Sequence, residues 1–191
     1  MWLFDTCSLI NLSYCSPIAA VFKARYNGTA GWVKAVQAEL VDQRAKRPPH
    51  PQAGKAVNWA SSWLGAAIVL DDDGDAEAVE EIRVAVSAGG GTSELDHLGE
   101  AASIRALLKY GPTWGSCRLI SDDRGARDEA RRRNVAAAST VGVVAKLIAL
   151  EPAPVPVANA ELYLGTLRKR RRMHVELSVD DLLANVLGSW E

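Results

Sequence analysis

Short apolar segments of strand length alternate with helix-like segments along this chain, and this alternation constrains its fold more than any other feature. The expected strands cover residues 1–4, 66–70, 117–121 and 135–138. Parallel neighbours in a sheet need a long crossover connection, which is usually a helix and nearly always right-handed. The alternation therefore predicts an α/β fold with a central, mainly parallel sheet.

The expected helices follow from apolar residues three or four positions apart. They cover residues 9–24, 30–46, 57–64, a segment around 79–86, 92–110, 124–133, 141–150, 160–173 and 178–187. Ser93 and Ser178 are suited to cap the N-termini of two of these helices. The proline-rich residues 48–51 and the glycine-flanked residues 111–115 are expected to be loops.

Length and composition favour one domain with a short extension. A chain of 191 residues, 48% hydrophobic and 24% charged, is suited to a soluble domain with one well-covered core. Pro152, Pro154 and Pro156 predict an extended linker. We therefore expect one domain over residues 1–150 and a C-terminal helical extension over residues 151–191, packed on the domain or on a partner.

The chain is expected to be cytoplasmic and to have no membrane role. No apolar run approaches the length that spans a bilayer, and the N-terminus lacks the basic region of a secretory signal. Cys7, Cys15 and Cys117 have no metal-ligand spacing and cannot all pair internally, which favours reduced thiols.

A net charge of −1 conceals separate basic and acidic clusters. Residues 44–47, 131–133 and 168–172 are basic, and such patches attract phosphate through their local potential, although each is equally typical of a solvated helix face. Acidic residues 71–75 resemble the start of a calcium loop, but Ile82 stands where that loop needs its last carboxylate. This acidic segment therefore predicts a turn and a helix start.

Carboxylates directly follow two of the predicted strands. Asp5 ends the first strand, and Asp122 and Asp123 follow the strand at 117–121. In open α/β sheets, ligands bind outside the carboxyl ends of the strands. These acids are candidates for a shared site, although each is also an ordinary residue at a strand end or a helix start.

Two predicted helices add further acids. Glu39 borders the apolar stripe of the helix at 30–46, and its alternative role is that of a surface residue. Glu100 lies four residues after Asp96, so both project from one side of their helix, where Asp96 fits a helix start better than a ligand. Gly99 beside Glu100 permits the close approach of another group.

Carboxylates gathered in a partly dry cleft repel one another and need a counter-cation. Oxygen ligands without His or Cys select hard ions such as Mg²⁺ or Mn²⁺. A site of this kind is suited to the cleavage of phosphodiesters.

Through four motifs in this order, the chain resembles the PIN-domain family of metal-dependent nucleases. The motifs lie at residues 4–10, 38–40, 98–104 and 119–127, and residues 135–150 resemble the family's last strand and helix. The resemblance covers nearly the whole chain and implies a PIN-like three-layer α/β/α sandwich. The chain departs from the family pattern in the long stretch at 46–91 and in its doubled acid after the strand at 117–121.

The resemblance also implies roles for the acids and their neighbours. The catalytic acids would be Asp5, Glu39, Glu100 and Asp123. One or two Mg²⁺ or Mn²⁺ ions would be held by Asp5, Glu100 and Asp123, with Asp122 as the alternative to Asp123. Thr6, Ser8 and Ser121 would hydrogen-bond the ligating carboxylates, and Arg124 and Arg127 would meet the backbone of the nucleic acid.

The function that the resemblance implies is a Mg²⁺-dependent endoribonuclease that acts as the toxin of a bacterial toxin-antitoxin pair. Its expected partners are RNA, a cognate antitoxin protein and a second copy of the chain. The alternative is a non-catalytic PIN-like module that binds RNA or protein. A haloacid-dehalogenase-like phosphatase is disfavoured, because it needs a second Asp two residues after the first, where Cys7 stands.

Overall fold

A four-stranded parallel sheet forms the centre of the computed structural model, which describes residues 1–46, 48–87, 97–150, 152–170 and 178–186. The strands lie in the order β2-β1-β3-β4. They are β1 (Trp2–Phe4), β2 (Ala30–Gly31), β3 (Arg118–Ile120) and β4 (Ala137–Ala138). Every pair is parallel, with Leu3 of β1 opposite Gly31 on one side and Leu119 on the other. The predicted α/β class with a parallel sheet is confirmed.

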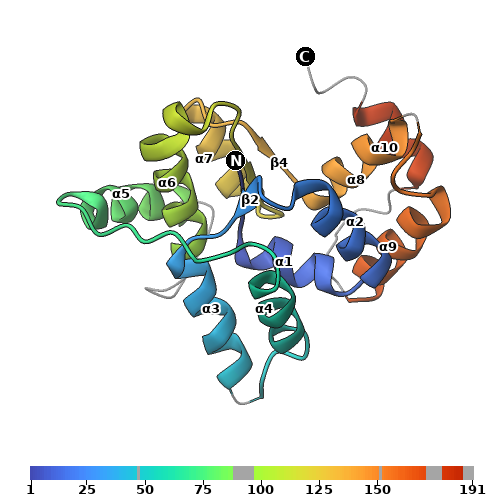
Figure 1. Cartoon of the computed structure of the whole chain (residues 1–191), viewed down its shortest axis with the longest axis horizontal. Helices are drawn as coiled ribbons and strands as arrows, with labels where there is room; N and C mark the ends of the chain where they lie inside the picture. The colour runs from blue at the N-terminus through green and yellow to red at the C-terminus, as the bar shows by residue number, and fades with distance from the viewer. Residues whose placement is uncertain (47, 88–96, 151, 171–177, 187–191) are drawn as a thin grey trace.

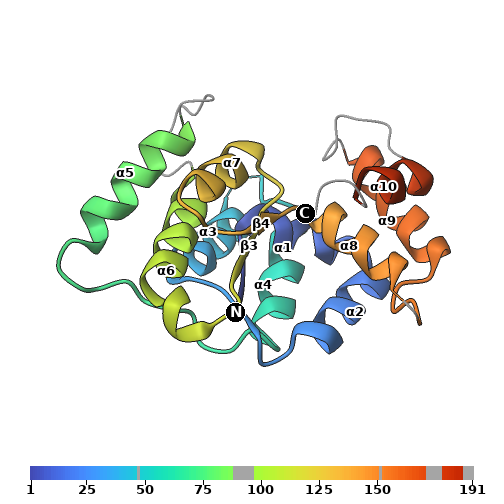
Figure 2. The same cartoon turned by 90° about the horizontal axis from the view of Figure 1, so that it is seen from above.

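Helices cover both faces of the sheet, an arrangement compatible with three α/β/α layers (Figure 2). On one side lie α6 (Leu98–Trp114) and α7 (Arg124–Arg132); on the other lie α1 (Thr6–Ser13), α2 (Ser16–Tyr26) and α8 (Thr140–Ala149). The chain moves from β1 to β2 in one direction along the sheet and from β2 through β3 to β4 in the other. Right-handed crossovers in opposite directions place their helices on opposite faces.

Burial from both sides explains why the strands are continuously apolar. The side chains of Leu3, Phe4, Leu119 and Ile120 are fully buried. A parallel strand covered on both faces cannot alternate polar and apolar residues, because neither face meets water. The sheet is therefore the inner layer that fixes where its strand ends point.

Three further helices surround this central unit. Helices α3 (Lys34–Ala45) and α4 (Ala53–Ser61) pack side by side (Figure 1), and α5 (Asp75–Ser87) packs along α6. The predicted apolar face of α5 is buried, and its start is tied to α6 by ion pairs from Asp75 to Arg105 at 2.8 Å and to Lys109 at 2.6 Å. The acidic segment thus provides the N-terminal turn of α5.

The C-terminal helices pack on the same side of the molecule as α2 and α8 (Figure 1). They are α9 (Val157–Lys169) and α10 (Val179–Val186), and Ser178 caps α10 by accepting a hydrogen bond from the Asp181 N–H at 3.0 Å. Tyr163 and Leu167 of α9 are buried in the common core. Nowhere in the described ranges does a helix combine the length and the apolar character needed to cross a bilayer.

The segment expected to be helical over residues 9–24 is divided into α1 and α2. Helix α1 ends at Ser13, and Cys15 precedes the first residue of α2 with extended backbone angles. Pro17 lies in the first turn of α2, where its missing N–H has no helical partner to lose. Pro17 therefore starts a new helix and prevents α1 from continuing.

The helix expected over residues 30–46 begins later, because Ala30 and Gly31 form β2. Neither residue favours a strand by itself, so pairing with β1 must impose this conformation. The prediction of a strand over residues 66–70 was wrong about its length. Only Ile68 makes a single parallel bridge there, to Val33.

Residues 111–115 were expected to be a loop, but α6 continues to Trp114 and includes Pro112 in its last turn. The rings of Tyr110 and Trp114 lie one turn apart with centroids at 5.5 Å, and their packing favours the extra turn. Gly115, at φ 71°, then ends the helix in a backbone conformation that suits glycine. Ser93 and Asp96, expected near the start of α6, lie outside the described residues.

Candidate acidic site

The sheet order places the carboxyl ends of β1 and β3 at a topological switch point. The chain leaves β1 toward β2 and leaves β3 toward β4, in opposite directions, and a crevice for ligands forms between two such strands. Asp5 directly follows β1, and Ser121 directly follows β3. The Asp5 N–H donates a hydrogen bond to the Ile120 carbonyl at 3.1 Å, so these two strand ends lie side by side.

Asp5 is fully buried and caps the N-terminus of α1. Its Oδ1 accepts a hydrogen bond from the Ser8 N–H at 2.7 Å, and its Oδ2 accepts one from the Ser121 hydroxyl at 2.5 Å. The Ser8 hydroxyl donates to the Ile120 carbonyl at 3.1 Å, and the same side chain also interacts with Asp5 and lowers the pKa of that carboxyl. Of the hydroxyls expected to support the acids, those of Ser121 and Ser8 both interact with Asp5, and Ser8 adds its backbone N–H.

The environment of Asp5 disfavours its charged form. The pKa of the Asp5 carboxyl is raised from 3.8 to about 7, first by burial and then by the charge of Asp122, while the hydrogen bonds from Ser121 and Ser8 oppose the rise. At neutral pH this carboxyl is therefore only partly ionised. A nearby cation would favour the ionised form.

Glu39 is held in place by both of its carboxylate oxygens. The Thr6 hydroxyl donates a short hydrogen bond to Oε2, and the Gly99 N–H donates one to Oε1 at 2.7 Å. Gly99 lies in the first turn of α6, where backbone N–H groups have no partner within the helix. Glu39 is thus fixed between α1 and α6 and is not a freely solvated surface residue.

Gly99 leaves the space that Glu39 occupies. A Cβ atom at this position would lie 2.8 Å from Glu39 Oε2 and 3.0 Å from Val36 Cγ2. The close approach expected beside Glu100 is therefore made by the Glu39 carboxylate. Any larger residue at position 99 would displace that carboxylate.

Glu100 is the acid whose pKa is affected by three other acids. Its side chain is 6% exposed, and its carboxyl accepts no side-chain hydrogen bond from another described residue. Burial raises its pKa well above the usual range, and the charges of Asp5, Glu39 and Asp123 raise it further. Acids from four separate segments therefore share one electrostatic neighbourhood.

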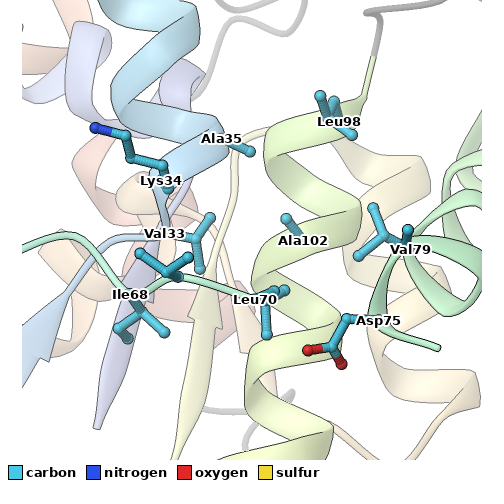
Figure 3. A pocket seen from close by; sticks show the side chains of 11 residues that line it. Val33, Lys34, Ala35, Ile68, Leu70, Asp75, Val79, Leu98 and Ala102 are labelled. Atoms are coloured by element: carbon cyan, nitrogen blue, oxygen red, sulfur yellow. The ribbon is translucent and has the colours of Figure 1, made fainter. Parts of the chain in front are cut away.

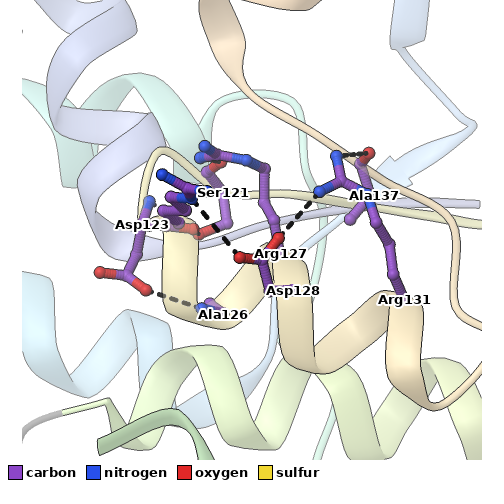
Figure 4. Close-up of polar contacts among 8 residues, drawn as sticks. Ser121, Asp123, Ala126, Arg127, Asp128, Arg131 and Ala137 are labelled. Atoms are coloured by element: carbon purple, nitrogen blue, oxygen red, sulfur yellow. Dashed lines mark hydrogen bonds and ion pairs between the residues drawn. The ribbon is translucent and has the colours of Figure 1, made fainter. Parts of the chain in front are cut away.

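The adjacent acids after β3 have different surroundings. Asp123 caps α7, with its Oδ1 accepting a hydrogen bond from the Ala126 N–H at 2.7 Å (Figure 4), and its Oδ2 has no partner among the described residues. Asp122 accepts hydrogen bonds from Asn11 Nδ2 at 2.7 Å and from the N–H and hydroxyl of Thr140, both at 2.8 Å. Asp122 is thus occupied by structural contacts, whereas Asp123 retains an open oxygen.

The two expected arginines also differ. Arg127 turns back to donate to the Ser121 carbonyl at 2.8 Å, which places it at the edge of the acid cluster (Figure 4). The side chain of Arg124 is 89% exposed and lies 3.5 Å from Asp128, one turn along α7. Arg127 is therefore positioned by the strand end, and Arg124 is exposed to any approaching polyanion.

The donor set fits a hard divalent cation, because it consists of carboxylate oxygens, and the charges of three of these acids raise the pKa of the fourth, Glu100. Asp5 and Glu100 have raised pKa values, and Asp123 has one oxygen without a partner among the described residues. These three residues could therefore hold such an ion. In the described part of the chain, no three His, Cys, Asp or Glu side chains converge closely enough to hold a metal ion directly. Mg²⁺ usually keeps several waters and takes only one or two carboxylates, so direct contact with every acid is not required.

The residues that fix Asp122 were missed in the sequence. Asn11 is a polar residue among the apolar positions of α1, which was the one available signal. Thr140 and Tyr163 carry no local signal, because the hydroxyl contact between them, at 2.7 Å, joins two different helices. The residues that hold Asp122 therefore come from segments that only the tertiary fold brings together.

A separate apolar pocket lies between the start of α3, residues 68–70, α5 and α6 (Figure 3). Val33, Leu70, Val79 and Leu98 point into a space of about 230 Å³. None of the acids of the cluster lines this pocket. The pocket and the acid cluster are thus different features.

Comparisons with known proteins identify no relative. A scan against protein-family models found no match, and searches of curated proteins and of solved structures likewise found none. The function must therefore be inferred from the residues and the geometry of the site.

Proposed function

We propose that this protein is a PIN-like, Mg²⁺-dependent endoribonuclease. The observation that carries this proposal is the buried Glu100 carboxyl, whose pKa is raised by burial and by the charges of Asp5, Glu39 and Asp123. Such repulsion within a buried cluster is relieved by a hard cation, and cleavage of phosphodiesters is the chemistry that oxygen-bound Mg²⁺ commonly supports. The four motifs that resemble the PIN-domain family support the same assignment.

Each acid then has a specific role. Asp5, Glu100 and Asp123 would hold Mg²⁺ or Mn²⁺, in part through water, and Glu39 would complete the negative site from its place against Thr6 and Gly99. A bound Mg²⁺ supplies an activated water and stabilises the charge on the leaving oxygen. Binding of the ion would favour the ionised form of Asp5, whose pKa is raised to about 7.

The surrounding groups orient the acids and the substrate. The Ser121 hydroxyl and the Ser8 N–H hold the two oxygens of Asp5 in fixed directions. Arg127, at the edge of the cluster, and the exposed Arg124 contact phosphates of the RNA. These contacts hold the RNA backbone beside the acids.

The proposal is tested by incubating single-stranded RNA with the purified protein and Mg²⁺. We expect cleavage that is lost with a chelator and with Asp5→Asn. Asp42→Asn is a matched control, because the exposed Asp42 on α3 pairs only with Lys46, at 3.4 Å, among the described basic residues. Cleavage that survives both the chelator and Asp5→Asn would refute a metal-dependent mechanism at this site.

The biological role proposed here is that of a toxin that acts in the cytoplasm as a homodimer and is held inactive by an antitoxin protein. Induced expression should arrest bacterial growth, and Asp5→Asn should relieve the arrest while the protein still accumulates. Arrest by the Asp5→Asn variant would separate toxicity from the acid cluster.

A non-catalytic PIN-like module that binds RNA or protein is the second candidate. It is favoured by one observation, that no three ligand side chains of the described residues converge closely enough to hold a metal ion directly. Salt-sensitive RNA binding by a protein that does not bind Mn²⁺ would select this module over the nuclease.

A further inference from the structure

Asp122 is joined to the C-terminal extension by a buried chain of hydrogen bonds. The Tyr163 hydroxyl of α9 lies 2.7 Å from the Thr140 hydroxyl of α8, which in turn lies 2.8 Å from Asp122 Oδ2. Asn11 of α1 completes the chain through its Nδ2, 2.7 Å from the same oxygen. Asn11, Thr140 and Tyr163 are each at most 3% exposed.

The direction of these hydrogen bonds follows from the chemistry of the groups. An ionised carboxylate only accepts, so Thr140 donates its single hydroxyl hydrogen to Asp122. Tyr163 must then donate to the Thr140 oxygen. Burial, and then the charge of Asp122, raise the pKa of the Tyr163 hydroxyl well above its usual range, which keeps it protonated as a donor.

The position of Asp122 affects both of its neighbours in the chain. Ser121 precedes it and donates to Asp5 Oδ2, and Asp123 follows it and caps α7. Because Asp122 is anchored to α1 and α8, the backbone that carries Ser121 and Asp123 is anchored as well. A shift of Asp122 would move a partner of Asp5 and a carboxylate of the cluster together.

We propose that Tyr163 is a positioning residue for the acid cluster and acts through Thr140 on Asp122. The inference rests on the proposed function, because positioning has a purpose only if the acids bind an ion. It makes the C-terminal extension a part of the site. It also assigns Asp122 to positioning, which leaves Asp123 as the ion ligand after β3.

The test measures Mn²⁺ binding by the full-length protein in the absence of RNA. Tyr163→Phe removes only the hydroxyl and should weaken Mn²⁺ binding about tenfold, the lower end of the effect seen when a group that supports a ligand is removed. Thr140→Val breaks the chain closer to Asp122 and should weaken it more. Tyr26→Phe is the matched control, because Tyr26 of α2 is also buried but packs against Trp2 of β1 and Phe22 of α2.

Stability measurements separate positioning from a general structural role. A purely structural role would lower the melting temperature of Tyr163→Phe and leave the Mn²⁺ dissociation constant of the folded protein unchanged. A Mn²⁺ dissociation constant for Tyr163→Phe that equals that of Tyr26→Phe would therefore overturn the proposal.

A protein that binds no Mn²⁺ at all would defeat the proposed function, and the hydrogen-bond chain would then be tested by itself. A double-mutant cycle with Tyr163→Phe and Asp122→Asn compares unfolding equilibrium constants in the absence of metal. Coupling through Thr140 predicts that the two effects differ from additivity by at least about threefold. Additive effects would show that Tyr163 does not act on Asp122.

Discussion

Two buried aspartates in this molecule experience opposite electrostatic environments. Asp75 at the start of α5 and Asp5 at the start of α1 are each at most 1% exposed. Asp75 is paired with Lys109 and Arg105, and the hydrogen bond from Lys109 is the main cause of its lowered pKa. Asp5 has hydroxyl and N–H partners together with a nearby carboxylate, and its pKa is raised to about 7.

The comparison shows that burial alone does not identify a functional acid. The charge of Asp75 is neutralised by Arg105 and Lys109, and these ion pairs join α5 to α6. Asp75 therefore needs no external cation. Asp5 lies beside the carboxylate of Asp122, which raises its pKa, and its own charge raises the pKa of Glu100. A buried acid whose charge is not compensated by the protein is a candidate for binding an external cation.

The largest expected difference between the two aspartates is in catalysis. If the proposed function holds, Asp5→Asn should lower kcat/KM for RNA cleavage by on the order of 10³-fold, because it removes a proposed ligand of the charge-stabilising ion. Asp75→Asn should leave kcat unchanged and lower the melting temperature, because it breaks the ion pairs to Arg105 and Lys109. Steady-state cleavage and thermal unfolding of the two variants provide the measurement, and equal loss of activity in both would end the distinction.

The next effect is on the pH dependence of stability without metal. The folded-state pKa of Asp5, about 7, exceeds its ordinary value of 3.8, and that of Glu100 is also raised. The native state therefore holds more protons than the unfolded state between these values, so stability should fall as pH rises from about 4 to 7, by a few kcal/mol. Urea unfolding at several pH values measures this slope, which Asp5→Asn should flatten and Mg²⁺ should counteract near pH 7.

A smaller effect is expected from filling the space beside Glu39. Gly99→Ala places a Cβ atom 2.8 Å from Glu39 Oε2 and should reduce cleavage by about 10–100-fold through displacement of that carboxylate. Gly165→Ala in α9 is the control, since no heavy atom lies within 4 Å of its added Cβ. If both variants cleave RNA like the wild type, Glu39 does not need its observed position.

The smallest effect is expected at the surface. Arg124→Gln should weaken RNA binding only a few-fold and lower the salt dependence of binding by about one counterion, because the exposed side chain meets a phosphate in water. Arg25→Gln, at an exposed position of α2, should leave the salt dependence unchanged. Binding measured over a series of salt concentrations distinguishes them, and identical slopes for the two variants would remove Arg124 from the interface.

The sequence was informative where one residue sufficed to indicate a position. Asp5 directly follows β1, and Asp123 belongs to the acid pair that follows β3 within three residues, so local patterns indicated both positions. The strand Ala30–Gly31 could not be predicted, because neither residue favours extended structure and β1 imposes the pairing. The hydrogen bonds that hold Asp122 could not be predicted either, because one of its partners, Asn11, lies 111 residues before it.

The burial of Tyr163 against Thr140 also sets an order of events during synthesis of the chain. Asp5 leaves the ribosome before α9, with roughly 10–30 seconds between them at about 5–20 residues per second. Until α9 emerges, Thr140 lacks its last partner and the surfaces of α2 and α8 that α9 will cover remain open to water. The nascent chain therefore completes this corner of the molecule only after α9 has emerged.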